Sequence, residues 1–328
     1  MNKWSLTSLV AAGALLATVS VQAAEVKIAL DSPPDMQKAG SYVWSHTFAE
    51  ELKKHGMAAK EFPRGALGGE AERLDQTSQG LLEVNMADVK SAGKVDKLIF
   101  GLYLPYLYED NDHQDRAVAH AGLLERINKN IAKGGIRILA MTVVGPASGI
   151  FNTKRPIRSV KDMADLRMRA LDENQIALYK AWGSNGTIVA WKEVPNALQT
   201  GVAHGYMNPS FVPVMFGHTD FIKHFTDAKS IVGGRLAIAS NDWYMGLSDK
   251  ERTIVDNAAD VATKANRAWL KKAEPGMLKG LEKAGVSIVQ LTPQARAEFQ
   301  ELSKEVYKNG VLTPDQVKIW VDAANATR

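Results

Sequence analysis

Residues 166–209 read LRMRALDENQIALYKAWGSNGTIVAWKEVPNALQTGVAHGYMNP. This segment alternates short apolar runs with amphipathic stretches, and it predicts strand, helix, strand, helix and strand within about 45 residues. Such a unit places the ends of its strands beside one another at one edge of a sheet, where ligands bind in open α/β folds. We expect strands at Arg167–Ala170, Ile188–Trp191 and Gly205–Asn208, and helices at Glu173–Trp182 and Glu193–Thr200.

The chain on either side continues the same alternation. Glu25–Leu30 alternates polar and apolar residues as a strand does, and the apolar run Ile136–Val144 is typical of a buried strand. The pattern indicates an α/β fold with helices on both faces of mainly parallel sheets. Further strands are expected at Ala58–Phe62, at Val84–Val89 and before Ser240, and further helices at Gly40–His55, Glu70–Gln79, His113–Lys133, after the cap Ser159–Asp162, at Ser248–Lys283 and at Pro293–Asn309.

The first residues have the features of a secretory signal peptide. Lys3 precedes an apolar run at Leu6–Val21 that ends in small residues. The run is shorter than the roughly 20 apolar residues that a membrane span needs, so we expect cleavage after Ala23 or Ala24. Residues 1–23 would be removed, and the mature chain would be periplasmic.

The composition excludes several classes of protein. The chain contains no cysteine, which rules out disulfides, thiolate metal sites and a cysteine nucleophile. A hydrophobic content of 45% is that of a globular protein, and the length suffices for two domains. The formal net charge is +4, with basic and acidic residues intermixed. Because a nucleic-acid surface needs clustered Lys and Arg, a nucleic-acid partner is disfavoured.

Two segments could bind an anion. Arg169 lies at the end of an expected strand, and an arginine that projects from there into a cleft suits a carboxylate, because its planar fork makes two parallel charge-assisted bonds. An ordinary surface salt bridge is the alternative. Gly65–Arg73 is a glycine-bearing loop before a helix, whose free N–H groups could face an anion. It matches neither the dinucleotide fingerprint nor the P-loop, so the residues alone favour a plain helix entry.

Candidates for catalysis are few. Gly145–Gly149 reads GPASG and departs from the G-x-S-x-G pattern of a nucleophile elbow. His218, Asp220 and His224 lie close together, but their spacing is not an established one for metal ligands. We therefore expect no catalytic residue, no metal and no cofactor.

Six short motifs occur together along the mature chain. They are LGGE at 67–70, LPYL at 104–107, NTKRPI at 152–157, LRMR at 166–169, WKEVPNALQTG at 191–201 and GYMNP at 205–209. Together they resemble the DctP-type solute-binding proteins of tripartite ATP-independent periplasmic (TRAP) transporters. The resemblance implies two α/β lobes joined by crossing strands and a long helix, with a ligand cleft between them. Lobe I would comprise residues 24–146 and 235–274, and lobe II residues 147–234 and 275–328.

The resemblance also implies roles for single residues. Arg169 matches the family arginine that pairs with the ligand carboxylate, Asn208 matches its asparagine partner, and Trp191 matches the aromatic residue that shapes the pocket. Glu70 and Arg73 match a loop of the first lobe that closes on the other end of the ligand. The implied function is a receptor that binds a small organic acid and delivers it to a membrane permease. We expect this receptor to be a monomer.

Departures from the family pattern bear on the ligand. Many members carry a further arginine shortly before the NTKRPI motif, where this chain has Ser148 and its neighbours. The missing second clamp disfavours a dicarboxylate, and Ser148 is retained as a candidate ligand residue. Trp191 and Tyr206 beside one arginine suit a less polar monocarboxylate, such as an aromatic acid. A sugar acid or a dicarboxylate stays an alternative ligand, and a periplasmic sensor or a secreted hydrolase stays an alternative function.

Overall fold

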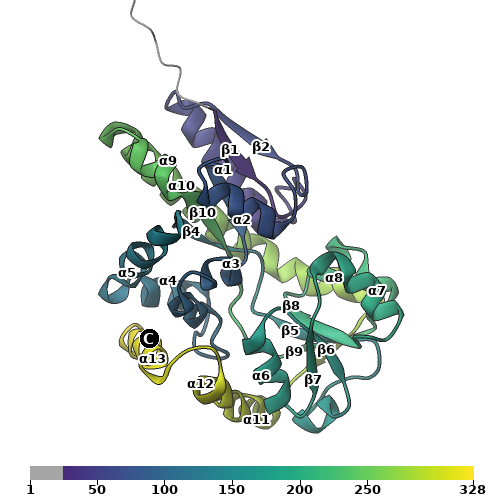
Figure 1. Ribbon diagram of the computed structural model, residues 1–328. Coiled ribbons are helices and arrows are strands. Elements are labelled where there is room, and N and C mark those ends of the chain that lie inside the picture. Colours follow the sequence, from purple (N-terminus) through teal and green to yellow (C-terminus); the bar gives the residue numbers. More distant parts are fainter. Residues whose placement is uncertain (1–24) are drawn as a thin grey trace, which may run out of the picture.

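The computed structural model describes residues 25–328, so the expected signal peptide lies outside the described range. Figure 1 shows two lobes, each built on one sheet with helices around it, and the long helix α10 extends from one lobe to the other. The expected α/β architecture is therefore confirmed. The strands are β1 (Val26–Ala29), β2 (Ala59–Phe62), β3 (Val84–Ala87), β4 (Ile136–Val143), β5 (Gly149–Asn152), β6 (Arg167–Ala170), β7 (Asn185–Ile188), β8 (Gly205–Asn208), β9 (His224–Asp227), β10 (Gly234–Ser240) and β11 (Ser287–Gln290).

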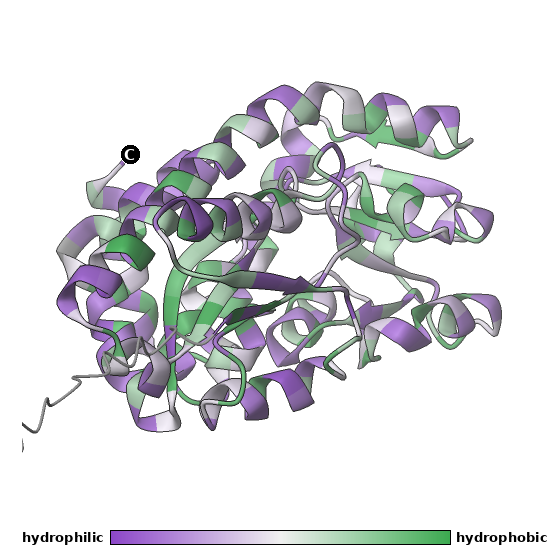
Figure 2. Cartoon of the chain, turned by 90° about the horizontal axis from the view of Figure 1, so that it is seen from above, coloured by the Kyte–Doolittle hydropathy of each residue, from purple (hydrophilic) through white to green (hydrophobic). Residues whose placement is uncertain are grey.

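The helices form the outer layer of both lobes. In Figure 2 the hydrophilic residues gather on these helices, while much of the central strand ribbon is hydrophobic. The helices are α1 (Gly40–Lys54), α2 (Glu70–Ser78), α3 (Val89–Gly93), α4 (Asn111–Ala119), α5 (Leu123–Ile131), α6 (Glu173–Ala181), α7 (Val194–Gln199), α8 (Val212–Met215), α9 (Asn241–Gly246), α10 (Asp249–Lys283), α11 (Pro293–Ser303), α12 (Glu305–Asn309) and α13 (Pro314–Ala326).

The sheet of the first lobe has the order β2-β1-β3-β10-β4. Strand β1 is parallel to β2 and β3, whereas β10 is antiparallel to both β3 and β4. The direction of β10 follows from connectivity, because β4 carries the chain towards the second lobe and β10 brings it back. Alternate side chains of β10 therefore lie in two different hydrophobic cores. Leu236 and Ile238 face one, and the small Ala237 and Ala239 face the other.

The sheet of the second lobe has the order β11-β9-β5-β8-β6-β7. Strands β6, β7 and β8 are mutually parallel, and β5 is antiparallel to β8 and β9. Both sheets are thus mixed but mainly parallel, as expected, because among the described strands only β10 in the first sheet and β5 in the second run against the others. Two short connections between strands cross between the lobes, from β4 to β5 and from β9 to β10. In each crossing the strand that enters the other lobe, β5 or β10, runs against its neighbours there.

Other differences from the expected elements have local causes. The expected helix 113–133 is interrupted at Gly122, which has a φ of 63°, and the expected helix 293–309 is divided into α11 and α12. Strand β7 ends at Ile188, where the expected strand begins, because this edge strand is largely exposed and lacks the apolar alternation that marks a strand. The short strands β5, β9 and β11 and the helix α13 were not expected.

Helix α13 does not lie where the expected lobe boundaries place it. Residues 275–328 were assigned to the second lobe, but Val317, Trp320 and Ala324 of this helix belong to a core of the first lobe. The indole N–H of Trp320 donates to the carbonyl of Leu98 at 2.7 Å. An amphipathic pattern identifies the apolar face of a helix but not the surface that the face covers. Among residues 25–328, no helix combines the length and the apolar character that a membrane crossing requires.

Candidate functional site

A cavity of about 510 Å³ lies between the two lobes. Its polar residues follow a rule of open α/β sheets, since most of them stand at or just beyond the carboxyl ends of strands. Asp31 follows β1, Arg64 follows β2, Asp88 follows β3, Arg169 is the third residue of β6, and Asn208 ends β8. Arg235, near the start of the antiparallel β10, reaches the same edge of the first sheet. The order and direction of the strands therefore place charged side chains from both lobes around the same cavity.

Arg169 is the buried cation of the second-lobe wall. The residue is 4% exposed, and its Nε donates to the carbonyl of Val189 at 3.0 Å. Its Cζ lies 5.5 Å from the ring centroid of Trp191. Among the residues that the structure describes, no group accepts a hydrogen bond from its Nη1 or Nη2. Burial lowers the pKa of this guanidinium, because the charged form loses hydration without gaining a carboxylate.

Aromatic rings surround this arginine. The ring of Trp191 lies 5.7 Å from that of Tyr206 and 5.2 Å from that of Phe216, both nearly perpendicular to it. Tyr206 is fully buried, does not line the cavity, and is hydrogen-bonded to Nδ1 of His218 at 3.0 Å. Burial lowers the pKa of His218 to about 4. Trp191 therefore forms the cavity surface, and Tyr206 supports it from behind.

Asn208 and Ser148 line the cavity near the crossing segments. Asn208 pairs in register with Gly149 of β5, and its side-chain amide makes no hydrogen bond within residues 25–328. The backbone of Ser148 is held by Ile231 and Ser230, and its hydroxyl is likewise free of partners in the described part of the chain. With no base within hydrogen-bond distance, Ser148 lacks the partner that a serine nucleophile requires.

Glu70 and Arg73, both on α2, line the first-lobe wall but are occupied by the protein itself. Arg73 is 4% exposed and donates to the side chain of Asn85 and to the carbonyls of Gly68 and Met86. These bonds anchor α2 to β3. Arg73 thus uses its donors within its own lobe, whereas Arg169 keeps two terminal nitrogens unused.

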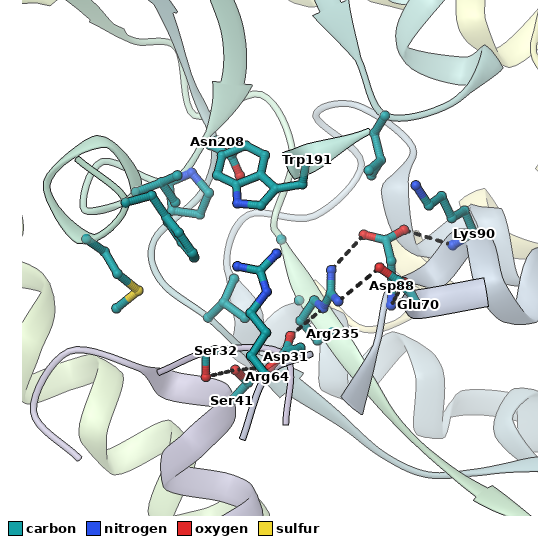
Figure 3. A pocket seen from close by; sticks show the side chains of 18 of the residues that line it. Asp31, Ser32, Ser41, Arg64, Glu70, Asp88, Lys90, Trp191, Asn208 and Arg235 are labelled. Atoms are coloured by element: carbon teal, nitrogen blue, oxygen red, sulfur yellow. Dashed lines mark hydrogen bonds and ion pairs between the residues drawn. The ribbon is translucent and has the colours of Figure 1, made fainter. Parts of the chain in front are cut away.

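Arg235 is the centre of a charge cluster that the sequence did not reveal (Figure 3). Its Nε lies 2.6 Å from Asp31 Oδ2, although the N–H is not aligned for a hydrogen bond. Its Nη1 donates to Asp88 Oδ2 and its Nη2 to Glu70 Oε2, each at 3.4 Å. Burial acts to lower the pKa of Arg235, but the three carboxylates outweigh it and hold that pKa above its usual value.

Two of the three carboxylates, Glu70 and Asp88, differ in their pKa shifts. Burial alone would raise the pKa of Glu70, but Arg235, the Asp88 N–H and the Ser91 hydroxyl lower it to about 2. Burial raises the pKa of Asp88. Glu70 therefore holds its negative charge more firmly than Asp88 does.

Sequence reasoning missed Asp31, Arg64, Asp88 and Arg235. The available signal was their position, because Asp31 and Arg64 come just after the expected strands Glu25–Leu30 and Ala58–Phe62, and Asp88 lies near the end of the expected strand Val84–Val89. Applied to every strand, the carboxyl-end rule would have found these three. Arg235 had no such signal, because it begins a strand.

The other sequence candidates do not form a site. His218 is bonded to Tyr206, and within residues 25–328 no group of His, Cys, Asp or Glu could hold a metal ion. What the cavity offers instead is a buried guanidinium with two unused terminal nitrogens, two free polar side chains and an aromatic wall. Such a surface can bind an anionic solute and has no evident machinery for a reaction.

Comparisons with known proteins show the family to which the chain belongs. The family model of the bacterial extracellular solute-binding proteins, family 7 (DctP), matches residues 32–312. The ectoine/5-hydroxyectoine-binding periplasmic protein UehA of Ruegeria pomeroyi is 28% identical, with 80% of this chain and 79% of UehA covered. The C4-dicarboxylate-binding periplasmic protein DctP of Rhodobacter capsulatus is 24% identical, with 92% of each covered.

A solved structure confirms the fold. The TRAP periplasmic solute-binding protein of Xanthobacter autotrophicus, solved with bound β-D-galacturonate, has a TM-score of 0.81 and 22% identity, with 93% of this chain and all of that chain covered. The chain belongs to family 7 of the bacterial extracellular solute-binding proteins, the DctP family of TRAP transporters, whose members bind solutes and are not enzymes.

Proposed function

We propose that this protein is a periplasmic receptor that captures a small carboxylate on Arg169 and delivers it to a TRAP permease. The observation that carries the proposal is the Arg169 guanidinium, which is 4% exposed, faces the cavity and has two terminal nitrogens without partners among residues 25–328. A carboxylate would accept two parallel hydrogen bonds there and compensate the buried charge. Asn208 stands nearby with a free amide that can donate to the same ligand.

Two further observations support a carboxylate. The residues that line the cavity include six cations and three carboxylates, so the walls have an excess of positive charge. The solutes named for UehA and for the Rhodobacter protein both carry carboxylate groups. Trp191 and Phe216 supply an apolar wall for the body of the ligand, as an aromatic or other less polar acid would need. We expect the receptor to work as a monomer.

Capture would be coupled to closure of the lobes. The walls belong to different lobes, joined by the segments after β4 and β9 and by α10. A ligand that touches both walls favours the closed state by the contacts that only this state makes.

The first test is a thermal-shift screen of the mature chain against aromatic acids, sugar acids, hydroxy and keto acids and dicarboxylates. A ligand at 100 times its Kd should add about 2.7 kcal/mol of stability. The best acid is then titrated calorimetrically into Arg169→Lys, which we expect to bind about 100-fold more weakly, because lysine lacks the bidentate fork.

The matched control is Arg167→Lys. Arg167 lies on the same strand two residues earlier, but it is exposed and bonds to the carbonyl of Gly201 instead of facing the cavity. This variant should bind like the parent chain. Equal weakening in both variants, or in neither, would remove Arg169 from the site, and the absence of any acid that binds would refute the proposed ligand class.

A further inference from the structure

The hydroxyl of Tyr179 joins the two strands that carry Arg169 and Asn208. Tyr179 is fully buried on α6 and does not line the cavity. Its hydroxyl donates to the carbonyl of Arg169 on β6 at 3.2 Å and accepts from the N–H of Met207 on β8 at 3.1 Å. One oxygen atom therefore bonds to the backbone of one candidate ligand residue and to the residue directly before the other.

This link lies where the pairing of the two strands ends. Strands β6 and β8 are parallel, and within the described strands their last pair in register is Arg169 with Tyr206. Asn208 lies two residues further along β8, beyond the pairing with β6. The backbone ladder therefore does not continue to Asn208, and the Tyr179 hydroxyl provides a further connection between the two strands at their carboxyl ends.

Tyr179 supports the strands from the face opposite the cavity. It packs in one hydrophobic core with Met168 and Ala170, the two neighbours of Arg169 along β6. Because side chains alternate along a strand, Arg169 starts from the other face of the sheet. An acid on Arg169 would therefore not touch Tyr179, and Tyr179 can act on its binding through the backbone of the two strands.

Helix α6 holds the ring of Tyr179 in a fixed place. Near the start of the helix, Asn174 Oδ1 accepts a hydrogen bond from the N–H of Val311 at 3.0 Å. Directly after its end, the indole N–H of Trp182 donates to the hydroxyl of Ser303 at 3.0 Å. Both ends of the helix are thus anchored by buried bonds, and residues locked in this way can hold a binding geometry precisely.

We propose that Tyr179 is a positioning residue, whose hydroxyl sets the placement of the Arg169 guanidinium relative to the Asn208 amide for a bound carboxylate. The inference rests on the proposed function and deepens it, because it gives a residue outside the cavity a part in the affinity for the acid. Without the hydroxyl, the carbonyl of Arg169 and the N–H of Met207 each lose a buried partner, so the two strand ends can move relative to each other.

The test uses acetate as the probe, because acetate presents a carboxylate with almost no further group. The chain is produced with isotope-labelled arginine, and the Nε–H resonance of Arg169 is assigned by its absence in Arg169→Lys. This N–H is bonded to the carbonyl of Val189, which protects it from solvent. Acetate is titrated at constant ionic strength, and the shift of the resonance gives the Kd. We expect Tyr179→Phe to raise that Kd about 5- to 10-fold.

A second readout separates positioning from a loss of stability. Nuclear relaxation of the same N–H, measured without acetate, reports the order of the guanidinium. Tyr179→Phe should lower this order, because the strand end that carries Arg169 has lost its support. If either the Kd for acetate or the order of the guanidinium is the same in this variant as in the parent chain, the positioning role is refuted.

The matched control is Tyr108→Phe. Tyr108 is also a buried tyrosine whose hydroxyl donates to a backbone carbonyl, that of Gly101 at 3.0 Å. It belongs to a core of the first lobe and does not line the cavity. Both variants should be destabilised to a similar extent in urea, but Tyr108→Phe should bind acetate like the parent chain. Equal weakening of acetate binding in both variants would mean that lower stability is the cause, and the proposal would fall.

The outcomes separate this inference from the proposed function. If acetate shifts the Arg169 resonance with the same Kd in the parent chain and in Tyr179→Phe, Tyr179 has no positioning role and the carboxylate receptor stands. If acetate does not shift this resonance in the parent chain, Arg169 does not bind a carboxylate and both proposals fail. Phenylalanine keeps the ring that packs in the core, so Tyr179→Phe should fold, and circular dichroism checks each variant.

Discussion

The two lobes treat buried charge in opposite ways. In the first lobe Arg235 lies among Asp31, Glu70 and Asp88, and the protein itself supplies every partner. In the second lobe Arg169 has no carboxylate partner, and Asp172 has a buried Oδ2 without any hydrogen-bond partner among residues 25–328. The difference shows that burial in a cleft does not by itself make an arginine a ligand-binding residue. The donors that the protein leaves unused indicate where a ligand can bind.

The strongest way to break this comparison is to remove Arg235. Arg235→Met leaves three carboxylates close together without their cation, and we expect it to destabilise the fold by about 3–5 kcal/mol at pH 7. The loss should shrink as the pH falls, because protonation relieves the repulsion. Urea denaturation at pH 7 and pH 5 measures it.

An exposed ion pair provides the control for that variant. Lys318 pairs with Asp322 on α13, where both side chains are largely exposed, and Lys318→Met should cause no measurable loss. If Arg235→Met were as stable as the parent chain, the cluster would not hold the first lobe together, and the contrast between the lobes would be wrong.

The same substitution at Arg169 should have the opposite effect on stability. Arg169→Met removes a buried charge that lacks a carboxylate, so we expect the fold to be unchanged or more stable by about 1 kcal/mol, while carboxylate affinity falls by about 100-fold or more. The lost bond to Val189 limits the gain in stability. Urea denaturation and calorimetric titration of the same preparation measure both quantities. A loss of stability equal to that of Arg235→Met would mean that the two arginines have the same structural role.

The pH dependence of stability that Asp172 causes gives a further test of the comparison between the lobes. Its Oδ1 accepts a hydrogen bond from the N–H of Gln175 and caps α6, and burial raises the pKa of its carboxyl to about 6, above the ordinary 3.8. A raised pKa means that the ionised form opposes folding. The contribution of protonated Asp172 to the free energy of unfolding is therefore lost as the pH rises through 6. Asp172→Asn keeps the cap without the charge and should be more stable by about 2 kcal/mol at pH 8, with no difference near pH 4.

Asp110→Asn is the matched control for that pH dependence. Asp110 caps α4 through the N–H of His113 at 2.7 Å, but it is exposed. We expect this variant to lack the gain of about 2 kcal/mol at pH 8, because the carboxylate that it removes is not buried. A constant difference between Asp172→Asn and the parent chain from pH 4 to pH 8 would contradict the burial of an ionised carboxylate in the second lobe.

The sequence predicted the α/β class, most of the longer elements and the strand that carries Arg169. The hydrophobic period of a helix or strand depends on residues close together in the sequence. It can therefore be recognised without knowing which elements pack beside it. The pairing of Arg235 with Asp31, Glu70 and Asp88 could not be predicted, because these residues come from segments up to about 200 residues apart that meet only in the folded sheet. Helix α13 was placed in the wrong lobe for the same reason.

Side-chain direction was the second limit. Tyr206 pairs in register with Arg169, so both start from the same face of the sheet, and the expectation that Tyr206 borders the ligand was reasonable. The structure covers Tyr206 with Trp191, which comes from the segment after β7 and packs against its ring. A strand pattern gives the face of a side chain but not what lies over it.

Tyr206→Phe tests that distinction with the smallest expected effect. The variant loses the buried hydrogen bond to His218 Nδ1, so the fold should lose about 1 kcal/mol. The affinity for a carboxylate should change less than about twofold, because the hydroxyl does not reach the cavity and the ring still supports Trp191. Denaturation and titration of one preparation separate the two quantities. A large loss of affinity with unchanged stability would place Tyr206 at the ligand and show that Trp191 moves aside when the ligand binds.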